Sequence, residues 1–381
     1  MNALKSLSRY GQTFWLDSLD DEFLTGGGWK SIIKRSDHQG MISRPPVYGK
    51  AIFPQPEYRQ LIYRLRDEGR DPMSIYECLA IREIRSAVER MRPVFASTHR
   101  QDGFVSLEVS PHLAFDTYAT LMEARRLWRA VGSDNLIIRI PATDEGIAAI
   151  PMLIAEVINV HATLVFSPQA YRRVAQAYLS GLEDLLEHGG DPSKVAAVAS
   201  FCLNRIDAEV DARLTALEMQ SRCSDEAASA KSLHGQMAIA SAKLTYQSFL
   251  EIHDEQRWSE LSQRWRALKG LGAKSLRLLW SGTEVKNPEY DELKYVEALI
   301  ARDTVSVMSP ATARVFRRRG RMVPTLEKDV EEAQAAVAQL KELGLAWEGL
   351  AGSLLADGVL AFRKSFDRLL DGIERRARVA A

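Results

Sequence analysis

Short apolar segments alternate along the chain with longer segments that have the periodicity of helices. Several of the short runs are apolar at consecutive positions, as in Leu136-Ile137-Ile138, so that both faces of the strand are apolar. That pattern is typical of a parallel sheet covered by helices on both sides. The eight runs, which are rich in β-branched residues, cover residues 13–19, 40–44, 104–110, 136–141, 160–167, 195–203, 275–281 and 304–310.

The segments between these runs carry apolar residues at helical spacing. Residues 119–131 place Leu121, Ala124 and Leu127 on one face, and residues 169–187 repeat the pattern. Eight strands separated by helices favour an α/β fold of the (β/α)8 TIM-barrel type. A doubly wound sheet with a helical cap is the alternative, but no Gly-x-Gly-x-x-Gly motif follows the first strand to support it.

Two stretches extend this repeating pattern. Residues 45–100 are mostly helical in pattern, with a turn at Pro54-Gln55-Pro56, and two amphipathic helices are predicted at 326–343 and 358–376. We expect one domain, residues 1–381, with strands from about 13 to 310 and a C-terminal helical extension from about 311 to 381 that packs on the barrel.

Composition excludes several classes of function. The chain has 50 basic and 50 acidic residues, so it lacks the one-sided basic field that nucleic-acid binding needs. The three cysteines are odd in number and widely spaced, which indicates a reducing compartment, and none pairs with a histidine at metal-ligand spacing. The chain has no run of about 18 apolar residues and no signal-peptide core. We therefore expect a cytoplasmic protein with no membrane partner, no metal and no cofactor.

Polar side chains occur where the predicted strands end. In a barrel of this kind the carboxyl ends of the strands face the active site, because that rim carries the loops from strand to helix. A charged group in an apolar strand is costly to bury unless it is paired, so several strands that each carry one predict a functional pocket. In chain order these residues are Asp17, Ser43, Arg44, Glu108, Arg139, Thr143, His161, Thr163, Ser200, Arg205, Ser281, Thr283 and Lys286.

Individual members of this set also have structural interpretations. Asp17 could cap the turn that follows it. Glu108 and Arg139 could form a structural ion pair in the barrel mouth. His161 taken alone would more often be a core histidine with its hydrogen bonds satisfied than a catalyst. The convergence of the whole set, rather than any one residue, predicts the pocket.

Longer motifs surround several of these positions. They include Phe14-Trp15-Leu16-Asp17, Ser106-Leu107-Glu108-Val109-Ser110-Pro111, Ile140-Pro141-Ala142-Thr143, Val198-Ala199-Ser200-Phe201, Arg205-Ile206-Asp207 and Lys286-Asn287-Pro288. With these motifs, nearly the whole chain resembles the transaldolases of the bacterial type with a long C-terminal extension. The resemblance implies a (β/α)8 barrel that binds a phosphorylated sugar, and the extra arginines described below extend the expected ligands to a phosphorylated sugar acid. It leaves a homo-oligomer open.

The resemblance also implies roles for particular residues. In transaldolases a lysine on the fourth strand forms a Schiff base with a ketose phosphate, while a glutamate and a threonine move protons through a water. Glu108 and Thr163 match that glutamate and threonine, and Asp17 matches an aspartate that acts as acid and base on a substrate hydroxyl. The residues that match those near the substrate phosphate are Ser200, Arg205 and Lys286.

The departures from the family pattern cluster at the reacting end of the expected pocket. Arg139 stands where the Schiff-base lysine is expected, and a guanidinium that stays protonated cannot act as the amine nucleophile. Arg44 stands in place of an asparagine on the second strand, and His161 in place of a substrate-binding asparagine on the fifth. Lys50 is the nearest replacement lysine by sequence, in a segment where the resemblance suggests a structural role.

Three interpretations of this altered pocket stay open. In the first, the protein is an enzyme in which Arg44 and Arg139 bind a second anion or stabilise an enediolate, while His161 and Glu108 move protons. In the second, it is a non-catalytic sugar-phosphate-binding pseudoenzyme. In the third, it is a transaldolase of the pentose phosphate pathway that transfers dihydroxyacetone by means of another lysine. The presence of a full proton-handling set favours the first, with ordinary transaldolase activity absent or weak.

Overall fold

Eight parallel strands close into a barrel, which confirms the predicted α/β fold. The computed structural model describes residues 3–17, 38–42 and 56–378. Each strand pairs in parallel with its neighbours in chain order, and β8 pairs with β1 to close the ring. The strands are β1 (Gln12–Asp17), β2 (Gly40–Ile42), β3 (Phe104–Glu108), β4 (Leu136–Pro141), β5 (Val160–Val165), β6 (Ala197–Cys202), β7 (Arg277–Ser281) and β8 (Thr304–Met308).

Alternate residues of each strand face the inside and the outside of the barrel, as the two-residue period of a strand requires. Outward residues such as Leu136 and Ile138 join the main apolar core with the surrounding helices. Inward residues such as Trp15, Ile137 and Leu279 form a smaller buried cluster. Both faces are covered, and this is why the strands are apolar at consecutive positions.

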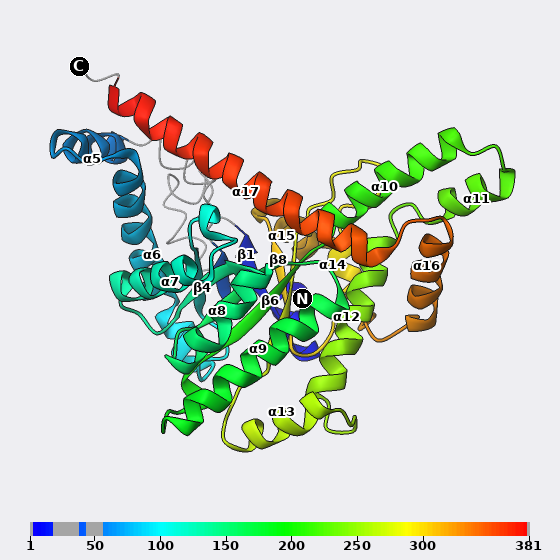
Figure 1. The fold of residues 1–381 in the computed structure, drawn as a ribbon, viewed down its shortest axis with the longest axis horizontal. Helices are drawn as coiled ribbons and strands as arrows, with labels where there is room; N and C mark the ends of the chain where they lie inside the picture. The colour runs from blue at the N-terminus through cyan, green and yellow to red at the C-terminus, as the bar shows by residue number, and fades with distance from the viewer. Residues whose placement is uncertain (1–2, 18–37, 43–55, 379–381) are drawn as a thin grey trace.

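Helices surround the barrel and extend from it on one side, where α10 and α11 project from the body of the molecule (Figure 1). Several begin at a side chain that accepts a hydrogen bond from the first turn, such as Asp116 before α7 and Ser167 before α9. The helices are α1 (Ala3–Ser6), η1 (Leu7–Tyr10), α5 (Pro56–Asp67), α6 (Pro72–Ser97), η2 (Pro111–Leu113), α7 (Thr117–Val131), α8 (Asp144–Ala155), α9 (Pro168–Glu187), η3 (Pro192–Lys194), α10 (Leu203–Gln220), α11 (Ser224–Ser232), α12 (Met237–His253), α13 (Glu260–Gly270), α14 (Lys294–Ala298), α15 (Pro310–Arg319), α16 (Val330–Glu342) and α17 (Trp347–Arg378).

The C-terminal helix α17 is longer than the sequence predicts. It begins at Trp347 rather than at residue 358, and its 32 residues run across the molecule from beside α16 to beside α5 (Figure 1). Gly349 and Gly352 lower the helix propensity of the missed part. Burial of Trp347 and Leu350 in the main core outweighs that cost, because each large apolar side chain contributes about 1.5–3 kcal/mol.

A buried ion pair closes the amino-terminal end of the barrel. Arg277, at the start of β7, donates to Asp102 Oδ1 over 2.9 Å and to the carbonyl oxygen of Gln101 over 3.0 Å. Trp15 Nε1 donates to the same carboxylate oxygen over 3.2 Å. These contacts lie at the end of the barrel opposite to the carboxyl ends of the strands. They therefore stabilise the fold and are not part of the predicted pocket.

No single helix in the described part of the chain is long and apolar enough to cross a membrane. The bent pair of α16 and α17 passes the same criterion of length and composition only when its two members, which meet at 87°, are taken together.

Candidate active site

Polar side chains follow the inward-facing apolar residues at the carboxyl ends of the strands. Asp17 lies two residues beyond Trp15, and Arg139 lies two residues beyond Ile137. Because the strand period is two, the side chains of Asp17 and Arg139 share the inward face with those apolar residues. Glu108 is the last residue of β3, and Thr163 and Ser200 lie two residues before the ends of β5 and β6, so residues predicted from five strands meet at one end of the barrel.

Arg139 is the centre of this set. Its side chain is buried, and its Nη2 donates to Thr163 Oγ1 over 3.1 Å. Its Nη1 lies 3.5 Å from Glu108 Oε2, and Glu108 is buried as well. The strand register explains the grouping, since Glu108 pairs with Arg139 and Thr163 pairs with Pro141 in the ladder. The residue at the expected lysine position therefore contacts both members of the expected proton relay.

The guanidinium of Arg139 is only partly satisfied. Among the described residues its buried Nε has no hydrogen-bond partner, and Thr163 is the one acceptor within hydrogen-bond distance. An arginine has five N–H donors and no acceptor, so one bond to Thr163 leaves donors of Arg139 available to a ligand. The separation of 3.5 Å from Glu108 is also longer than a charge-assisted hydrogen bond.

His161 lies one layer deeper than the residues around Arg139. It precedes Thr163 by two positions on β5 and is completely buried. Its Nδ1 forms a hydrogen bond of 3.0 Å with Ser106 Oγ, whose residue occupies the same layer on β3. The sequence predicted His161 as a catalytic residue without identifying this partner. The hydrogen bond fixes the orientation of the imidazole ring.

Strand β5 is irregular beside the site. Its pairing with β6 shifts register between Ala162 and Val165, and Leu164 adopts a left-handed conformation with φ of 62°. A β-branched or bulky residue rarely takes this conformation without support from its surroundings. Here the strain lies next to Thr163, and it turns Leu164 toward α17, where its side chain lies against Gly358.

The predicted phosphate-binding residues come from β6, from α10 and from the segment after β7. Ser200 Oγ donates to Ser281 Oγ over 3.0 Å, which joins β6 to β7. Arg205 is half-buried and lies in the first turn of α10 rather than on the sixth strand, because β6 ends at Cys202 and the helix begins at once. Lys286 is exposed in the segment after β7. Ser43, Arg44 and Lys50 lie outside the described residues.

Gly282 allows the segment after β7 to approach α10 closely. It has a φ of +64°, and a Cβ atom there would lie 2.6 Å from Asn204 Oδ1. Asn204 N donates to the carbonyl oxygen of Gly282 over 3.2 Å. A side chain at this position would push the segment that carries Lys286 away from the helix that carries Arg205.

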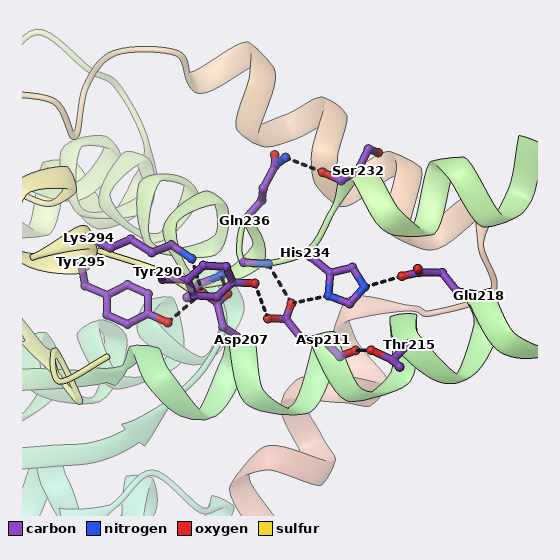
Figure 2. Close-up of polar contacts among 12 residues, drawn as sticks. Asp207, Asp211, Thr215, Glu218, Ser232, His234, Gln236, Tyr290, Lys294 and Tyr295 are labelled. Carbon is purple, nitrogen blue, oxygen red and sulfur yellow. Dashed lines mark hydrogen bonds and ion pairs between the residues drawn. The ribbon is translucent and has the colours of Figure 1, made fainter. Parts of the chain in front are cut away.

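A network of hydrogen bonds and ion pairs holds α10 against α14 and the segment before it (Figure 2). Asp207 Oδ2 accepts hydrogen bonds from Tyr295 Oη over 2.8 Å and from Lys294 Nζ over 3.1 Å. Asp211 Oδ2 accepts one from Tyr290 Oη over 2.9 Å, and burial raises the pKa of the Asp211 carboxyl. The network joins α10, which carries Arg205, to α14 and to the segment before α14, which carries Lys286. Composition gave no sign of it.

Two further predicted residues have structural contacts. Thr143 caps α8: its hydroxyl accepts from Gly146 N over 3.0 Å and donates to the carbonyl oxygen of Ala114. The Thr283 hydroxyl donates to the carbonyl oxygen of Val307. Both therefore hold the rim of the barrel together, and neither was among the residues expected to bind or react.

Phe362 is a site residue that the sequence analysis missed. It lies on α17, with its ring centroid 5.1 Å from the guanidinium carbon of Arg139 and 5.7 Å from that of Arg205. Its position in an amphipathic helix gave no signal that separates it from the core residues of that helix. Within the described residues, no group of three or more His, Cys, Asp or Glu side chains is arranged to hold a metal ion.

A closed parallel barrel with polar side chains at the carboxyl ends of its strands has the layout of a (β/α)8 barrel whose site lies in its mouth. A family model described as transaldolase/fructose-6-phosphate aldolase matches residues 14–373. The chain belongs to this family.

Similar proteins cover the full length of the chain. The transaldolase of Thiobacillus denitrificans is 39% identical over 370 residues, which is 97% of this chain and 99% of that protein. Transaldolase 2 of a Nostoc species is 35% identical over 383 residues, or 100% of this chain and 98% of that protein. Transaldolase 2 of Streptomyces avermitilis is 36% identical over 374 residues, or 98% and 96% of the two chains.

Proposed function

We propose that this protein is a transaldolase-family enzyme that acts on a phosphorylated sugar or sugar acid without forming a Schiff base. In this proposal Arg139 replaces the nucleophilic lysine and supplies a fixed positive charge to the substrate carbonyl. The chemistry is that of an enediolate, formed and consumed within cytoplasmic carbohydrate metabolism. Ordinary transaldolase activity is expected to be absent or weak.

The geometry of Arg139 supports this proposal most directly. A buried guanidinium is costly unless its donors are used, yet Nε of Arg139 has no partner among the described residues and Nη1 is 3.5 Å from Glu108. A carboxylate, phosphate or enediolate oxygen would satisfy the remaining donors. These unused donors are what we expect of an arginine that binds an oxygen atom of a ligand.

The substrate phosphate is proposed to lie beside β6 and the start of α10. Arg205 and Ser200 stand where the resemblance places the phosphate contacts, and α10 begins beside them without a side-chain cap. A helix start of this kind favours an anion, and Arg205 adds two or more donors in a planar fork. Lys286, exposed in the segment after β7, would add a point charge. A ligand held between Arg205 and Arg139 would carry its carbonyl, or a second anion, toward Arg139.

The reaction step follows from these positions. With the carbonyl oxygen held by Arg139, the Glu108 carboxylate removes a proton from the neighbouring carbon. The C–H electron pair forms the new C=C bond, and the carbonyl π pair moves to the oxygen, where Arg139 balances the charge. Glu108 then returns the proton to one of the two carbons, while Asp17 exchanges a proton with the adjacent hydroxyl. The step is balanced without an oxidant or reductant and gives isomerisation or epimerisation.

A non-catalytic sugar-phosphate binder is the second candidate. The observation that favours it is the contact of Arg139 with both Glu108 and Thr163, which engages the expected proton relay before any ligand arrives. A transaldolase with another lysine is the third, and the names of the relatives favour it. Two buried or half-buried lysines of the described part have other partners: Lys243 Nζ donates to the carbonyl oxygen of Lys328 over 2.6 Å, and Lys294 pairs with Asp207.

Borohydride trapping tests the absence of a Schiff base. The protein is incubated with fructose 6-phosphate and sodium borohydride, and intact mass is measured. We expect no adduct on the natural chain. The control is the Arg139→Lys variant, in which an adduct at position 139 would show that the rest of the pocket still accepts the sugar. A stable adduct on any lysine of the natural chain would overturn the proposal in favour of the third candidate.

Deuterium incorporation separates an enzyme from a binder. Sugar phosphates and phosphorylated sugar acids are first ranked by thermal shift, and the best ligand is then incubated in D2O and analysed by NMR. An enzyme of the proposed kind exchanges the proton next to the carbonyl, and Glu108→Gln abolishes exchange while retaining binding. Binding without exchange in the natural chain would support the pseudoenzyme and contradict the proposed reaction.

A further inference from the structure

The C-terminal helix is fastened across the open end of the barrel at two places. On one side, Arg363 donates to the carbonyl oxygens of Pro111 and His112 over 3.1 and 3.2 Å, beyond the end of β3. His112 Nε2 also lies 2.7 Å from Asp367 Oδ1. These contacts fix the register of α17 over the rim.

On the other side, α17 approaches the end of β5 at a glycine. A Cβ atom at Gly358 would lie 2.8 Å from Cδ2 of Leu164, the residue with the left-handed backbone. The absence of a side chain at position 358 therefore sets how closely the helix approaches the mouth. Phe362 follows one helical turn later and lies over the mouth.

Phe362 brings together two cations of the candidate site. Its ring lies 5.1 Å from the guanidinium carbon of Arg139 on β4 and 5.7 Å from that of Arg205 on α10. Two like charges in one small space repel each other, and the negative face of an aromatic ring offsets part of that cost. Phe362 therefore lies close to both guanidinium groups. Because its side chain has no oxygen or nitrogen that accepts a hydrogen bond, it leaves the N–H donors of both arginines available for an anion.

We propose that Phe362 is a positioning residue that holds Arg139 and Arg205 for a single ligand with negatively charged oxygen at both ends. This inference rests on the proposed function, and it names the ligand class: a phosphorylated sugar acid, whose carboxylate supplies both the second anion and the carbonyl oxygen at Arg139, rather than a sugar monophosphate. The phosphate binds at Arg205, the second anion binds at Arg139, and the ring excludes water between them. Specificity then depends on α17, which lies far from the barrel strands in sequence.

A simple packing role for Phe362 makes a different prediction. If the ring only fills space, leucine should replace it with little effect, because leucine is apolar and of similar bulk. If the face of the ring holds the cations, leucine should fail and tyrosine should succeed, because tyrosine keeps the π face. The variants Phe362→Leu and Phe362→Tyr therefore separate the two roles. Leu360→Ala, at an exposed position of the same helix, is the matched control.

The first experiment needs no ligand. The natural chain and the three variants are treated with phenylglyoxal, and the rates of modification at Arg139 and Arg205 are read by peptide mass spectrometry. We expect Phe362→Leu to raise the rate at both arginines by about fivefold, the change that corresponds to about 1 kcal/mol. Phe362→Tyr and Leu360→Ala should stay within about twofold of the natural chain. No change at either arginine, or a change at only one, would overturn the proposal.

The second experiment measures binding of 6-phosphogluconate and of fructose 6-phosphate by calorimetry. For 6-phosphogluconate we expect Phe362→Leu to weaken binding by about 5- to 30-fold and Phe362→Tyr to restore it. Equal losses for both ligands, or no loss, would contradict the positioning role while leaving the proposed function intact. Failure of every sugar phosphate to bind the natural chain would instead overturn the proposed function. The phenylglyoxal experiment would still decide whether Phe362 positions the two arginines, because it needs no ligand.

Gly358→Val tests the contact that sets the height of α17 without changing any residue of the mouth. The larger side chain must displace Leu164 or lift the helix. We expect the same pattern as for Phe362→Leu: faster modification of both arginines and weaker binding of the doubly anionic ligand. Unchanged modification and binding, with the fold intact by circular dichroism, would show that the position of α17 does not control the arginines.

Discussion

The pair formed by Arg139 and Glu108 offers a quantitative test of the site. Both side chains are buried at the carboxyl ends of neighbouring strands, with Nη1 and Oε2 3.5 Å apart. At an effective dielectric constant of 20, two unit charges at this distance attract with about 5 kcal/mol before desolvation is subtracted. Desolvation of both ions consumes most of this energy, so the pair is expected to contribute little net stability while each ion depends strongly on the other.

A double-mutant cycle converts that dependence into numbers. We expect Arg139→Met alone and Glu108→Gln alone each to lower the free energy of unfolding by about 3 kcal/mol, because each removes the opposite charge that the remaining buried ion faces across 3.5 Å. This value is the low end of the usual range, since 3.5 Å exceeds the length of a charge-assisted hydrogen bond. The double variant removes both charges and should cost no more than either single change, which gives a coupling energy of about 3 kcal/mol.

The measurement is urea unfolding of the four proteins, followed by far-ultraviolet circular dichroism and by tryptophan fluorescence to confirm that the transitions coincide. Equal m-values are needed for the comparison. Additive losses, with the double variant about 6 kcal/mol less stable, would refute the coupling. Losses below about 1 kcal/mol in both single variants would show that the pair is solvated and would remove the basis for treating Arg139 as a buried cation.

Three further predictions concern the supporting structure. Burial lowers the pKa of His253 to about 3 from its usual 6.5, so below pH 6.5 the native state binds fewer protons than the unfolded chain. The free energy of unfolding should therefore fall by up to about 1.4 kcal/mol per pH unit as the pH drops from about 6.5 toward 3. Urea titrations of His253→Asn should show a flatter pH dependence. Asp207→Asn should lower the free energy of urea unfolding by about 2–3 kcal/mol, because it weakens the hydrogen bonds that hold α10. Glu209→Gln on the same helix, which removes an exposed ion pair, should lower it by less than about 1 kcal/mol. Equal losses would show that the network around Asp207 has no special role. Arg277→Met should lower the free energy of unfolding by about 3–5 kcal/mol in the same measurement, because it breaks a buried ion pair. Arg319→Met, which breaks exposed ion pairs, should lower it by less than about 1 kcal/mol. A similarly small loss for both variants would contradict a stabilising role for the pair of Arg277 and Asp102.

The barrel could be predicted because its strands carry a strong local pattern. The fourth strand was predicted at residues 136–141 and is observed at Leu136–Pro141, because every residue of it except Arg139 is apolar, as expected of a strand buried on both faces. The predicted start of α17 was wrong. Glycines in its first turns weaken the local helical pattern, and burial of Trp347, through contacts distant in sequence, compensates for their low helix propensity. Local propensity decides an element only where tertiary packing does not oppose it.

The composition of the candidate site could be predicted in part. Asp17, Glu108, Arg139 and Thr163 were found from their positions at strand ends, and the structure brings the last three into contact. Their roles were not decided by sequence, because an ion pair and a substrate-binding arginine have the same residue types at the same positions. The distances, and the donors of Arg139 that remain without partners among the described residues, favour the second.

The sequence by itself determined the period of the strands, the positions at which charge enters the barrel, and the presence of arginine where the family resemblance expects an amine. These properties are local, since each depends on residue type and spacing within a few positions. Only the tertiary structure decided that Arg139 meets Glu108 and Thr163, that His161 bonds to Ser106 below them, and that a phenylalanine near the end of the chain lies over two arginines of the mouth. Those contacts depend on closure of the barrel and on the path of α17, which bring together residues far apart in the chain.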